Sequence, residues 1–332
     1  MNHKQKTKQI AATLSLIGMV MVVPASAYAQ AEFPNRPINL LVGYSAGGPT
    51  DNAARVIAEE MGKELGQPVV VVNKPGASGL VAAKDMMAAQ PDGYTILLAA
   101  NAFFTLGPAR YTLVDYDFDK DFVPIGGLSG YPHLLTVAMD SPIKSMEDLI
   151  DYSRKNPGKL NAARVGFSNE IAVEWLNLLG KMDITQIPYK GAATVVSDLS
   201  SGRIDLALIA PSVTYPLQDG DKARAIATTR ETPITKSRQI PAVSKTAGME
   251  EFDMYIWNGL FAPAGIPAPV VQKLAAALNQ SLAQPKVQKQ FETAFLDAAP
   301  MTAEELTKAV HEELSIAKHV VKEAKLPLLT HQ

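Results

Sequence analysis

The sequence predicts an α/β protein with two doubly wound lobes, and two observations predict this class. Short apolar runs alternate with segments whose apolar residues recur at spacings of three and four. Such a βαβα order is typical of largely parallel sheets with helices on both faces. The chain also has 332 residues, 47% of them hydrophobic, which is more than one core usually supports, so two lobes are expected.

The first elements form a strand, a turn and a helix. Residues 38–44 are a continuous apolar run, residues 45–50 are small or turn-forming, and residues 51–65 follow a helical pattern. The same order recurs with a strand, a small-residue turn, a helix and a further strand at 69–72, 76–79, 80–89 and 95–100.

The middle of the chain continues the alternation. We expect strands at 134–139, 160–165, 184–189 and 204–209, and helices at 146–155, 170–180 and 192–200. In open sheets of this type, ligands bind beyond the carboxyl ends of the strands. The turns that follow these strands are therefore the candidate site.

The N-terminus has the three parts of a secretion signal. A lysine-rich start precedes an apolar run at 10–24, and small residues end at Ala29. The apolar run has about 15 residues, fewer than the roughly 20 that a membrane span needs. We therefore expect residues 1–29 to be a cleaved signal peptide and the mature protein to be periplasmic, starting near Gln30.

The composition excludes several kinds of site. The chain has no cysteine, which excludes disulfides, thiolate metal sites and a cysteine nucleophile. Its 31 Lys and Arg, three of them in the signal, stand against 33 Asp and Glu, so the mature net charge is about −5. We expect no nucleic-acid partner, no metal and no cofactor, and a monomer.

Two enzyme motifs compete for the first turn. Residues 43–47 match the G-x-S-x-G nucleophile elbow around Ser45, but here the elbow follows the first strand instead of a sheet already built. Of the mature histidines, His311 and His319 lie on an expected terminal helix and His331 is next to the chain end. A triad is therefore poorly supported, and a secreted serine hydrolase is kept as an alternative.

The second motif is one residue away from a phosphate loop. Residues 43–50 read G-x-x-x-x-G-P-T, with Pro49 in place of the phosphate-binding lysine. Nucleotide hydrolysis is therefore not expected. Backbone N–H groups at a helix N-terminus still suit a single carboxylate, although Gly47 and Gly48 are equally consistent with a simple tight turn.

Several strings, in order along nearly the whole mature chain, together form a resemblance. They include Gly47-Gly48-Pro49-Thr50-Asp51, Pro91-Asp92-Gly93-Tyr94-Thr95, Ile187-Pro188-Tyr189-Lys190-Gly191 and Trp257-x-Gly259-Leu260-Phe261-Ala262-Pro263. With these strings the chain resembles the Bug-type receptors of tripartite tricarboxylate transporters.

The resemblance implies a fold of the periplasmic binding protein type, in which two lobes close on a ligand like a Venus flytrap. Residues 30–130 and 255–332 would form one lobe and residues 131–254 the other. The implied function is capture of an organic carboxylate, with dicarboxylates and aromatic carboxylates as candidates, and delivery to membrane permease subunits. A sensor kinase is a further candidate partner, and a periplasmic ligand sensor is an alternative function. No catalytic residue is implied.

The second-lobe loop departs from the family pattern. Gly166 is kept, but Ser168 stands where the family has a second glycine, and no histidine follows. Arg164 has two interpretations: an ion pair with Glu170 or Glu174, or a contact to a second ligand carboxylate. Our expected ligand-binding residues are Tyr44, Ser45, Ala46, Gly47, Gly48, Asp51, Ser78, Asn101, Phe103, Arg164, Gly166, Phe167, Ser168, Asn169, Tyr189 and Lys190.

Overall fold

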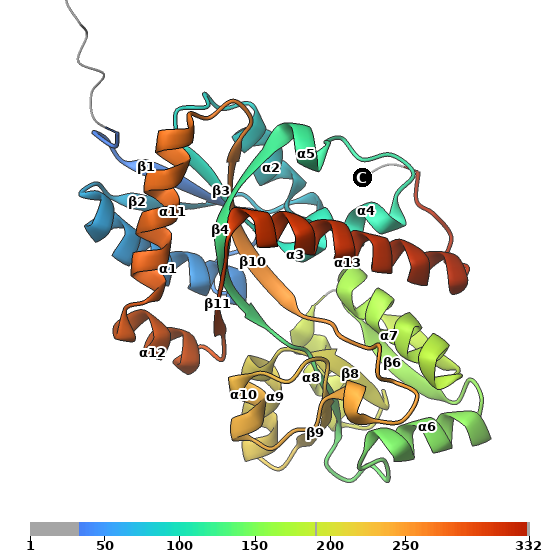
Figure 1. Ribbon diagram of the computed structural model, residues 1–332. Coiled ribbons are helices and arrows are strands. Elements are labelled where there is room, and N and C mark those ends of the chain that lie inside the picture. The colour runs from blue at the N-terminus through green and yellow to red at the C-terminus, as the bar shows by residue number, and fades with distance from the viewer. Residues whose placement is uncertain (1–32, 190, 331–332) are drawn as a thin grey trace, which may run out of the picture. The chain divides into compact units, whose positions relative to one another are not determined.

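The computed structural model describes residues 33–189 and 191–330, and Pro34–Gln332 form one compact unit (Figure 1). The predicted signal peptide lies outside the described residues. No helix in the described part of the chain combines the length and the apolar character of a membrane span.

A six-stranded sheet forms the core of what we call the first lobe. Its strand order is β11-β4-β10-β3-β1-β2. The strands are β1 (Ile38–Val42), β2 (Val69–Asn73), β3 (Thr95–Ala100), β4 (Phe122–Tyr131), β10 (Ile256–Pro263) and β11 (Asp297–Met301). Strand β1 pairs in parallel with β2 and β3, whereas the pairings of β10 and β11 are antiparallel.

The helices of the first lobe cover both faces of this sheet. They are α1 (Pro49–Leu65), α2 (Leu80–Met87), α3 (Asn101–Phe104), α4 (Leu106–Arg110), α5 (Phe118–Asp121), α11 (Ala268–Leu282), α12 (Pro285–Thr293) and α13 (Ala303–Glu323). A short 3₁₀ turn, η1 (Ala77–Gly79), precedes α2. Helix α1 packs on α11 and α12, and α13 packs on β4.

A five-stranded sheet forms the core of the second lobe, in the order β7-β6-β8-β5-β9. Its strands are β5 (Leu134–Ala138), β6 (Leu160–Arg164), β7 (Ile184–Pro188), β8 (Leu206–Ile209) and β9 (Ala223–Thr228). Its helices are α6 (Met146–Lys155), α7 (Gly166–Gly180), α8 (Ala192–Ser200), α9 (Pro211–Asp219) and α10 (Pro233–Ser237), with a 3₁₀ turn η2 (Val243–Lys245). Strand β5 is antiparallel to both of its neighbours.

Both sheets are therefore mixed, and the expectation of largely parallel sheets was wrong in this respect. The reason is that the chain leaves the first lobe through β4 and returns through β10, so these two strands run in opposite directions. An apolar run reveals a buried strand but carries no information on the direction of its neighbours.

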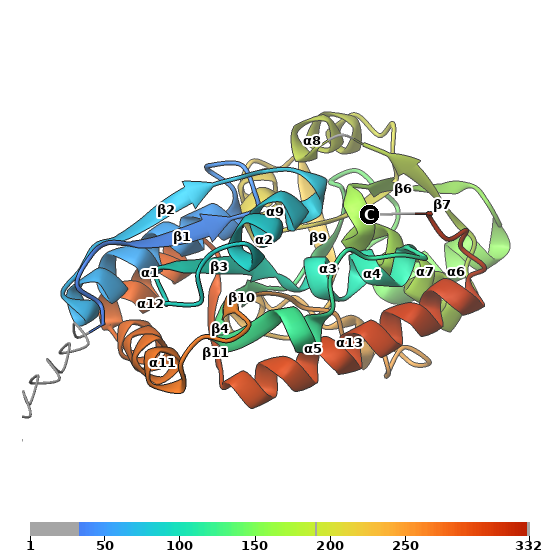
Figure 2. The same ribbon diagram turned by 90° about the horizontal axis from the view of Figure 1, so that it is seen from above.

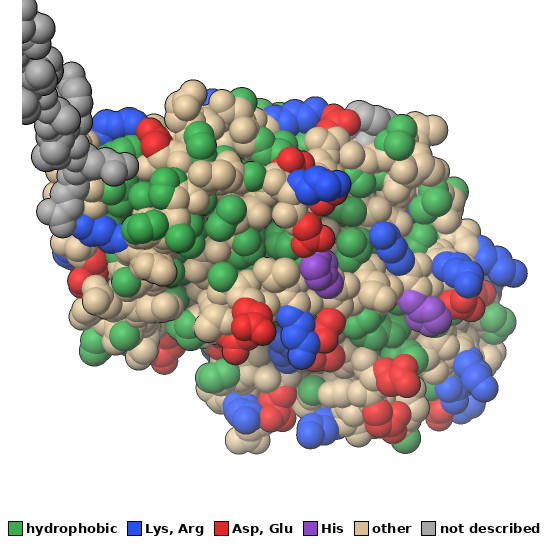
Figure 3. Space-filling model, turned by 45° about the horizontal axis from the view of Figure 1, so that its top comes forward, with side chains coloured by type: hydrophobic (Ala, Val, Ile, Leu, Met, Phe, Trp, Pro, Cys, Tyr) green, Lys and Arg blue, Asp and Glu red, His purple; other side chains and the backbone are tan. Residues whose placement is uncertain are grey.

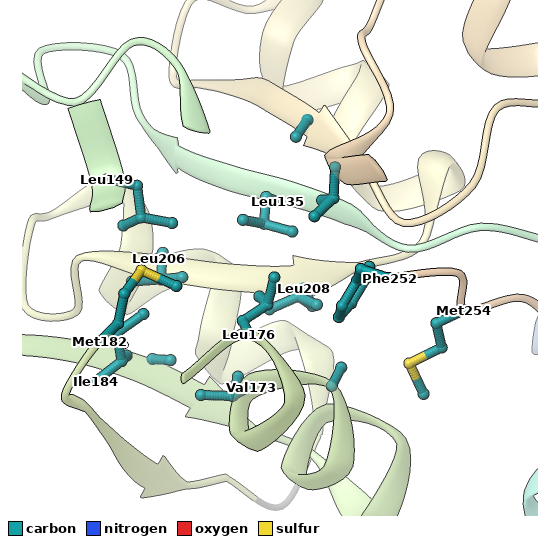
Figure 4. Close-up of a cluster of buried hydrophobic side chains, with 14 of the residues drawn as sticks. Leu135, Leu149, Val173, Leu176, Met182, Ile184, Leu206, Leu208, Phe252 and Met254 are labelled. Atoms are coloured by element: carbon teal, nitrogen blue, oxygen red, sulfur yellow. The ribbon is translucent and has the colours of Figure 1, made fainter. Parts of the chain in front are cut away.

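The core of the second lobe follows from the apolar periodicity of α7. Val173 and Leu176 are fully buried against the sheet, and Figure 4 shows Leu176 beside Leu208 of β8. Burying one such side chain contributes about 1.5–3 kcal/mol. This packing fixes α7, and with it the loop that precedes the helix.

A buried ion pair joins the two lobes. Arg110, the last residue of α4, donates from Nε to Glu170 Oε2 of α7 over 2.7 Å, and the two side chains are only 5% and 7% exposed. Tyr111 packs edge-on against Phe167, with ring centroids 5.6 Å apart. Helix α13 contacts both α4 and α7 (Figure 2), so the lobes share a helical junction.

The surface agrees with the modest net charge of the chain. On the face shown in Figure 3, acidic and basic side chains lie interspersed instead of forming separate regions of one sign. No strongly charged face of the kind that attracts nucleic acid is visible in this view.

We predict that Glu170→Ala lowers the free energy of unfolding by about 3–5 kcal/mol, because it leaves Arg110 buried without its carboxylate. Urea denaturation measures this. Lys155→Ala is the control, because the Lys155–Asp151 pair is 3.7 Å long and exposed and should contribute about 0–1 kcal/mol. Equal small losses in both variants would contradict a structural role for the Arg110–Glu170 pair.

Candidate functional site

The first candidate loop connects β1 to α1 and includes residues 44–48. Ser45, Ala46 and Gly47 are exposed. Gly47 has φ +87°, and a Cβ built there would meet no atom within 4 Å. A left-handed residue at this point requires glycine, and the open space in front of it gives a ligand access to the backbone.

Asp51 holds this loop in place. Its Oδ2 accepts a hydrogen bond from Gly47 N over 2.8 Å and one from Arg55 Nε over 2.9 Å. Its Oδ1 accepts from Asn73 Nδ2 over 2.8 Å, and the same amide donates to Tyr44 O over 3.0 Å. Burial alone would raise the pKa of Asp51, but these hydrogen bonds hold the pKa below its usual value.

We expected Asp51 to contact the ligand, but in the structure its side chain holds the loop by hydrogen bonds instead. The residue is 1% exposed, and both carboxylate oxygens are occupied by Gly47, Arg55 and Asn73. Asn73 was not among the expected site residues, although it stands at the carboxyl end of β2, where the rule for open sheets places ligands.

The backbone donors of the loop are available. Within residues 33–189 and 191–330, the N–H groups of Ser45, Ala46 and Gly48 have no hydrogen-bond acceptor. They lie beside the N-terminus of α1, a 17-residue helix whose dipole favours negative charge there. This arrangement suits an anion with two or more oxygen atoms.

A second turn lies directly against the first loop. A Cβ on Gly43 would come within 2.6 Å of the Cα of Gly79, so these two glycines allow a backbone contact that no larger residue permits. Ser78 is exposed and has φ +54°. Ser78 therefore remains a candidate for ligand contact.

The candidate loop of the second lobe joins β6 to α7. Gly166 has φ +77° and open space where a Cβ would lie. Phe167 and Ser168 are half-buried. Asn169 is a buried tether, because Oδ1 accepts from Val165 N over 3.2 Å and Nδ2 donates to Leu208 O over 2.5 Å. The first N–H groups of α7 have no acceptor within the helix and can receive an anion.

Arg164 forms an ion pair with Glu170, as one of the two interpretations of this residue predicted. Its Nη1 donates to Glu170 Oε1 over 2.9 Å, and its side chain is 36% exposed. Glu170 also accepts from Arg110. One carboxylate therefore serves two guanidinium groups, and the cluster keeps one positive charge at the end of β6.

Two other expected residues, Tyr189 and Phe103, lie in different surroundings. Tyr189 donates its hydroxyl to Asp198 Oδ2 over 2.8 Å, and Lys190 lies outside the described residues. Phe103 is 1% exposed and packs among Phe104, Tyr116 and Phe122. Its ring is thus part of the core of the first lobe instead of a wall of the ligand site.

Tyr44 was expected in the site and is half-buried. Burial of its hydroxyl, followed by the nearby Tyr131, raises the pKa of Tyr44 well above its usual value. Burial also raises the pKa of Tyr131 to about 12. Both phenols are therefore neutral hydrogen-bonding groups near neutral pH.

The surroundings of Ser45 do not contain a triad. None of the described histidines hydrogen-bonds to Ser45 in the structure. Burial lowers the pKa of His133 to about 4, and His311 pairs with Asp119 over 3.0 Å. Among the residues that the structure describes, Ser45 therefore has no general base of the kind that a hydrolase requires.

Asn101 points into a separate cavity of about 420 Å³, which we call the α13 cavity. Its Nδ2 donates to Tyr255 O over 2.8 Å and to Glu313 Oε2 over 2.9 Å. Trp257 Nε1 donates to Glu313 Oε1 over 2.5 Å. Burial raises the pKa of Glu313 to about 7, although the Asn101 and Trp257 hydrogen bonds and the charge of Arg230 oppose this rise.

Two α/β lobes, each with a candidate loop at a helix N-terminus, form the architecture of a two-lobed binding protein. The model for the family described as "Tripartite tricarboxylate transporter family receptor", or TctC, matches residues 53–326, and the chain belongs to this family. Its members are periplasmic solute-binding receptors. The chain is accordingly a periplasmic binding protein and not an enzyme, and the hydrolase alternative is set aside.

Relatives and solved structures agree with this assignment. The "UPF0065 protein in tcbD-tcbE intergenic region" of Pseudomonas sp. (strain P51) is 34% identical over 264 residues, 77% of this chain and 76% of the relative. Protein BugT of Bordetella pertussis is 29% identical over 296 residues, 88% of each chain. The structure of periplasmic binding protein BugD is 32% identical, with a TM-score of 0.74, over 90% of this chain and 100% of that one.

Two similar structures carry ligands. MatC (Rpa3494) from Rhodopseudomonas palustris with bound malate is 31% identical, with a TM-score of 0.73, over 87% of this chain and 100% of that one. R. palustris Rpa4515 with adipate is 27% identical, with a TM-score of 0.78, over 90% of this chain and 100% of that one.

We predict that Glu313→Gln removes a pH dependence of stability. The folded-state pKa of Glu313, about 7, lies above its ordinary value of 4.5. The wild type is therefore stabilised below pH 4.5 and loses this contribution as the pH rises through 7. The loss is about 3 kcal/mol, and urea titrations from pH 4 to pH 8 measure it.

The variant should show a flatter profile over this range. Glu304→Gln, on the same helix but exposed, should keep the wild-type slope. Superimposable profiles for wild type and Glu313→Gln would contradict the raised pKa.

Proposed function

We propose that this protein captures an organic carboxylate between residues 44–48 and residues 164–169 and delivers it to a membrane permease of the tripartite tricarboxylate type. One observation carries the proposal. Ser45, Ala46 and Gly48 present unpaired N–H groups beside the N-terminus of α1, and Asp51 fixes the loop from behind. Donors fixed before binding lose little conformational entropy when an anion arrives.

The ligand class we favour is a dicarboxylate. The positive charge left over in the Arg110–Glu170–Arg164 cluster supports this class, because Arg164 has donors that Glu170 does not use. Malate and adipate, in the two similar structures, each carry two carboxyl groups. The half-buried ring of Phe167 keeps aromatic carboxylates among the candidates.

The mechanism we propose is lobe closure without covalent chemistry. We assign residues 30–130 and 255–332 to the first lobe and residues 131–254 to the second. A ligand shifts the lobes towards a closed form only if it binds that form more tightly, so it must contact both loops. Permease subunits would recognise the closed monomer, and a sensor kinase is a second candidate reader. The signal peptide, residues 1–29, would be removed before folding in the periplasm.

We predict that Gly47→Val strongly weakens carboxylate binding, because valine resists φ +87° and places its branched side chain in the open space before the loop. A thermal-shift screen selects the ligand, since a carboxylate at 100 times its dissociation constant adds about 2.7 kcal/mol of stability. Calorimetry then compares variants. Ser45→Ala should lose only about 1 kcal/mol, the contribution of one neutral hydrogen bond.

Gly202→Val provides the matched control. Gly202 also has a positive φ, +69°, and no atom within 4 Å of a built Cβ, but it lies in the second lobe after α8. It should suffer the same backbone strain and retain binding. If Ser45→Ala abolished binding while Gly47→Val bound normally, the loop assignment would be wrong.

We also predict that Arg164 sets a preference for two carboxylates. Calorimetry compares adipate with hexanoate. A charge-assisted contact contributes about 1.5–3 kcal/mol, which is a roughly tenfold to hundredfold preference. Arg164→Ala should erase this preference while hexanoate affinity stays nearly unchanged, and Arg164→Lys should restore it only in part, since an ammonium lacks the planar fork.

Equal losses of adipate and hexanoate affinity in Arg164→Ala would mean that the residue acts only through its pair with Glu170. We would then abandon the proposed preference for dicarboxylates. The Gly47→Val experiment would still test carboxylate binding independently.

A further inference from the structure

The α13 cavity is not part of the carboxylate site. It is enclosed by α13, α7, strand β10 and the chain segment that leads into β10, and its volume of about 420 Å³ is in the range of small-molecule pockets. Of the residues expected in the ligand site, only Asn101 lines it. Most of its wall is apolar or aromatic, as in Leu106, Ile171, Trp175, Met254, Tyr255 and Trp257.

The buried polar groups in this wall have spare acceptor capacity. Asn101 is 2% exposed, and its Oδ1 is a buried atom without a hydrogen-bond partner among the described residues. The adjacent Glu313 accepts two hydrogen bonds from neutral groups, Asn101 and Trp257. A carboxylate oxygen can accept more than one hydrogen bond, so an occupant that donates hydrogen bonds can pair with Glu313, whereas Asn101 Oδ1 has almost no accessible surface.

The charges around the cavity favour a cation. Arg230 lines the cavity, but it is engaged by Asp253 through two hydrogen bonds of 2.5 and 2.7 Å. Glu312 and Glu251 lie at the rim, and Glu312 pairs with Lys308 over 3.6 Å. Glu313 is the largely buried acid, and within the described residues it has no ion-pair partner closer than 4 Å. Its negative charge is opposed only at longer range, by the charge of Arg230.

We propose that the α13 cavity is a second binding site, which takes a small organic ammonium ion. The ammonium group donates to the Glu313 carboxylate, which Asn101 holds in place through its Nδ2. The apolar part of the ligand lies against the aromatic wall, where Trp175 and Trp257 also offer cation–π contacts, whereas the Tyr255 ring already carries the Arg230 guanidinium 4.9 Å from its centroid. A metal ion is a poorer occupant, because no group of three or more His, Cys, Asp or Glu in the described residues could hold one.

The site spans both lobes. Glu313, Asn101 and Trp257 belong to the first lobe, whereas Ile171 and Trp175 belong to α7 of the second. An occupant that contacts both sides therefore biases the relative orientation of α7 and α13. By linkage, any such bias must change carboxylate affinity and amine affinity by the same factor.

The test uses phenethylammonium as the probe and 2-phenylethanol as its neutral analogue, with calorimetry at pH 8 on the whole mature protein. We expect wild type to bind the amine, and Glu313→Gln to weaken the amine roughly tenfold or more while leaving the alcohol unchanged. Glu323→Gln removes an exposed acid from the same helix and should bind like wild type. No amine binding by wild type, or equal binding by Glu313→Gln, would overturn the proposal.

Two further measurements separate this site from misfolding and from the carboxylate loop. Near pH 7, amine binding should release a proton from Glu313 in wild type and none in Glu313→Gln, as measured in buffers of different ionisation enthalpy. Ala309→Phe should fill the cavity and abolish binding of amine and alcohol alike. Gly47→Val should leave amine binding intact, and its loss in that variant would place the amine in the carboxylate site.

Discussion

The antiparallel pairing of β4 with β10 is the constraint on which the rest of the structure depends. Both crossings between the lobes run side by side through this pair, from Ile256 opposite Tyr131 to Pro263 opposite Phe122. Because successive residues of a strand point to opposite faces, β10 serves two different sites. Asn258 accepts a hydrogen bond from Thr50 of α1 over 3.1 Å, whereas Trp257 donates to Glu313 of α13.

Three carboxylates, two of them buried and one half-buried, are compensated in three different ways. Asp51 accepts from backbone, amide and guanidinium donors, and its pKa falls. Glu170 accepts from two arginines. Glu313 receives hydrogen bonds only from two neutral groups, and its pKa rises. Neutral donors satisfy hydrogen bonding but offset only part of the desolvation of a charge, so Glu313 is the carboxylate most easily neutralised by a proton or a cation.

The sequence predicted single strands, turns and helices better than it predicted the contacts between elements that are distant in the chain. The 38–44 strand, the glycine turn and the following helix were all predictable, because apolar runs, glycines and helical spacing are local signals. The direction of β10 and the role of Asp51 were not, since they depend on pairings with β3, β4 and Asn73 that lie far away in the chain. Phe103 and Asn101 followed a strand end, as site residues do, yet a helix begins at Asn101 and turns their side chains towards the aromatic core and the α13 cavity.

The α13 cavity lies beside α7, the helix that lobe closure would move. In the proposed mechanism, lobe closure would move α7 relative to the first lobe, to which α7 is joined by the Arg110–Glu170 pair and by the packing of α13. The carboxylate loop 164–169 and the cavity residues Ile171 and Trp175 lie on one continuous segment that includes the N-terminal half of α7. A rigid helix transmits a displacement at one of these points to the other, because its core side, at Val173 and Leu176, is close-packed. The same helix whose N-terminus is proposed to bind the carboxylate therefore also forms a wall of the cavity, and an occupant that binds the open and closed forms with different affinities would change the equilibrium on which capture depends.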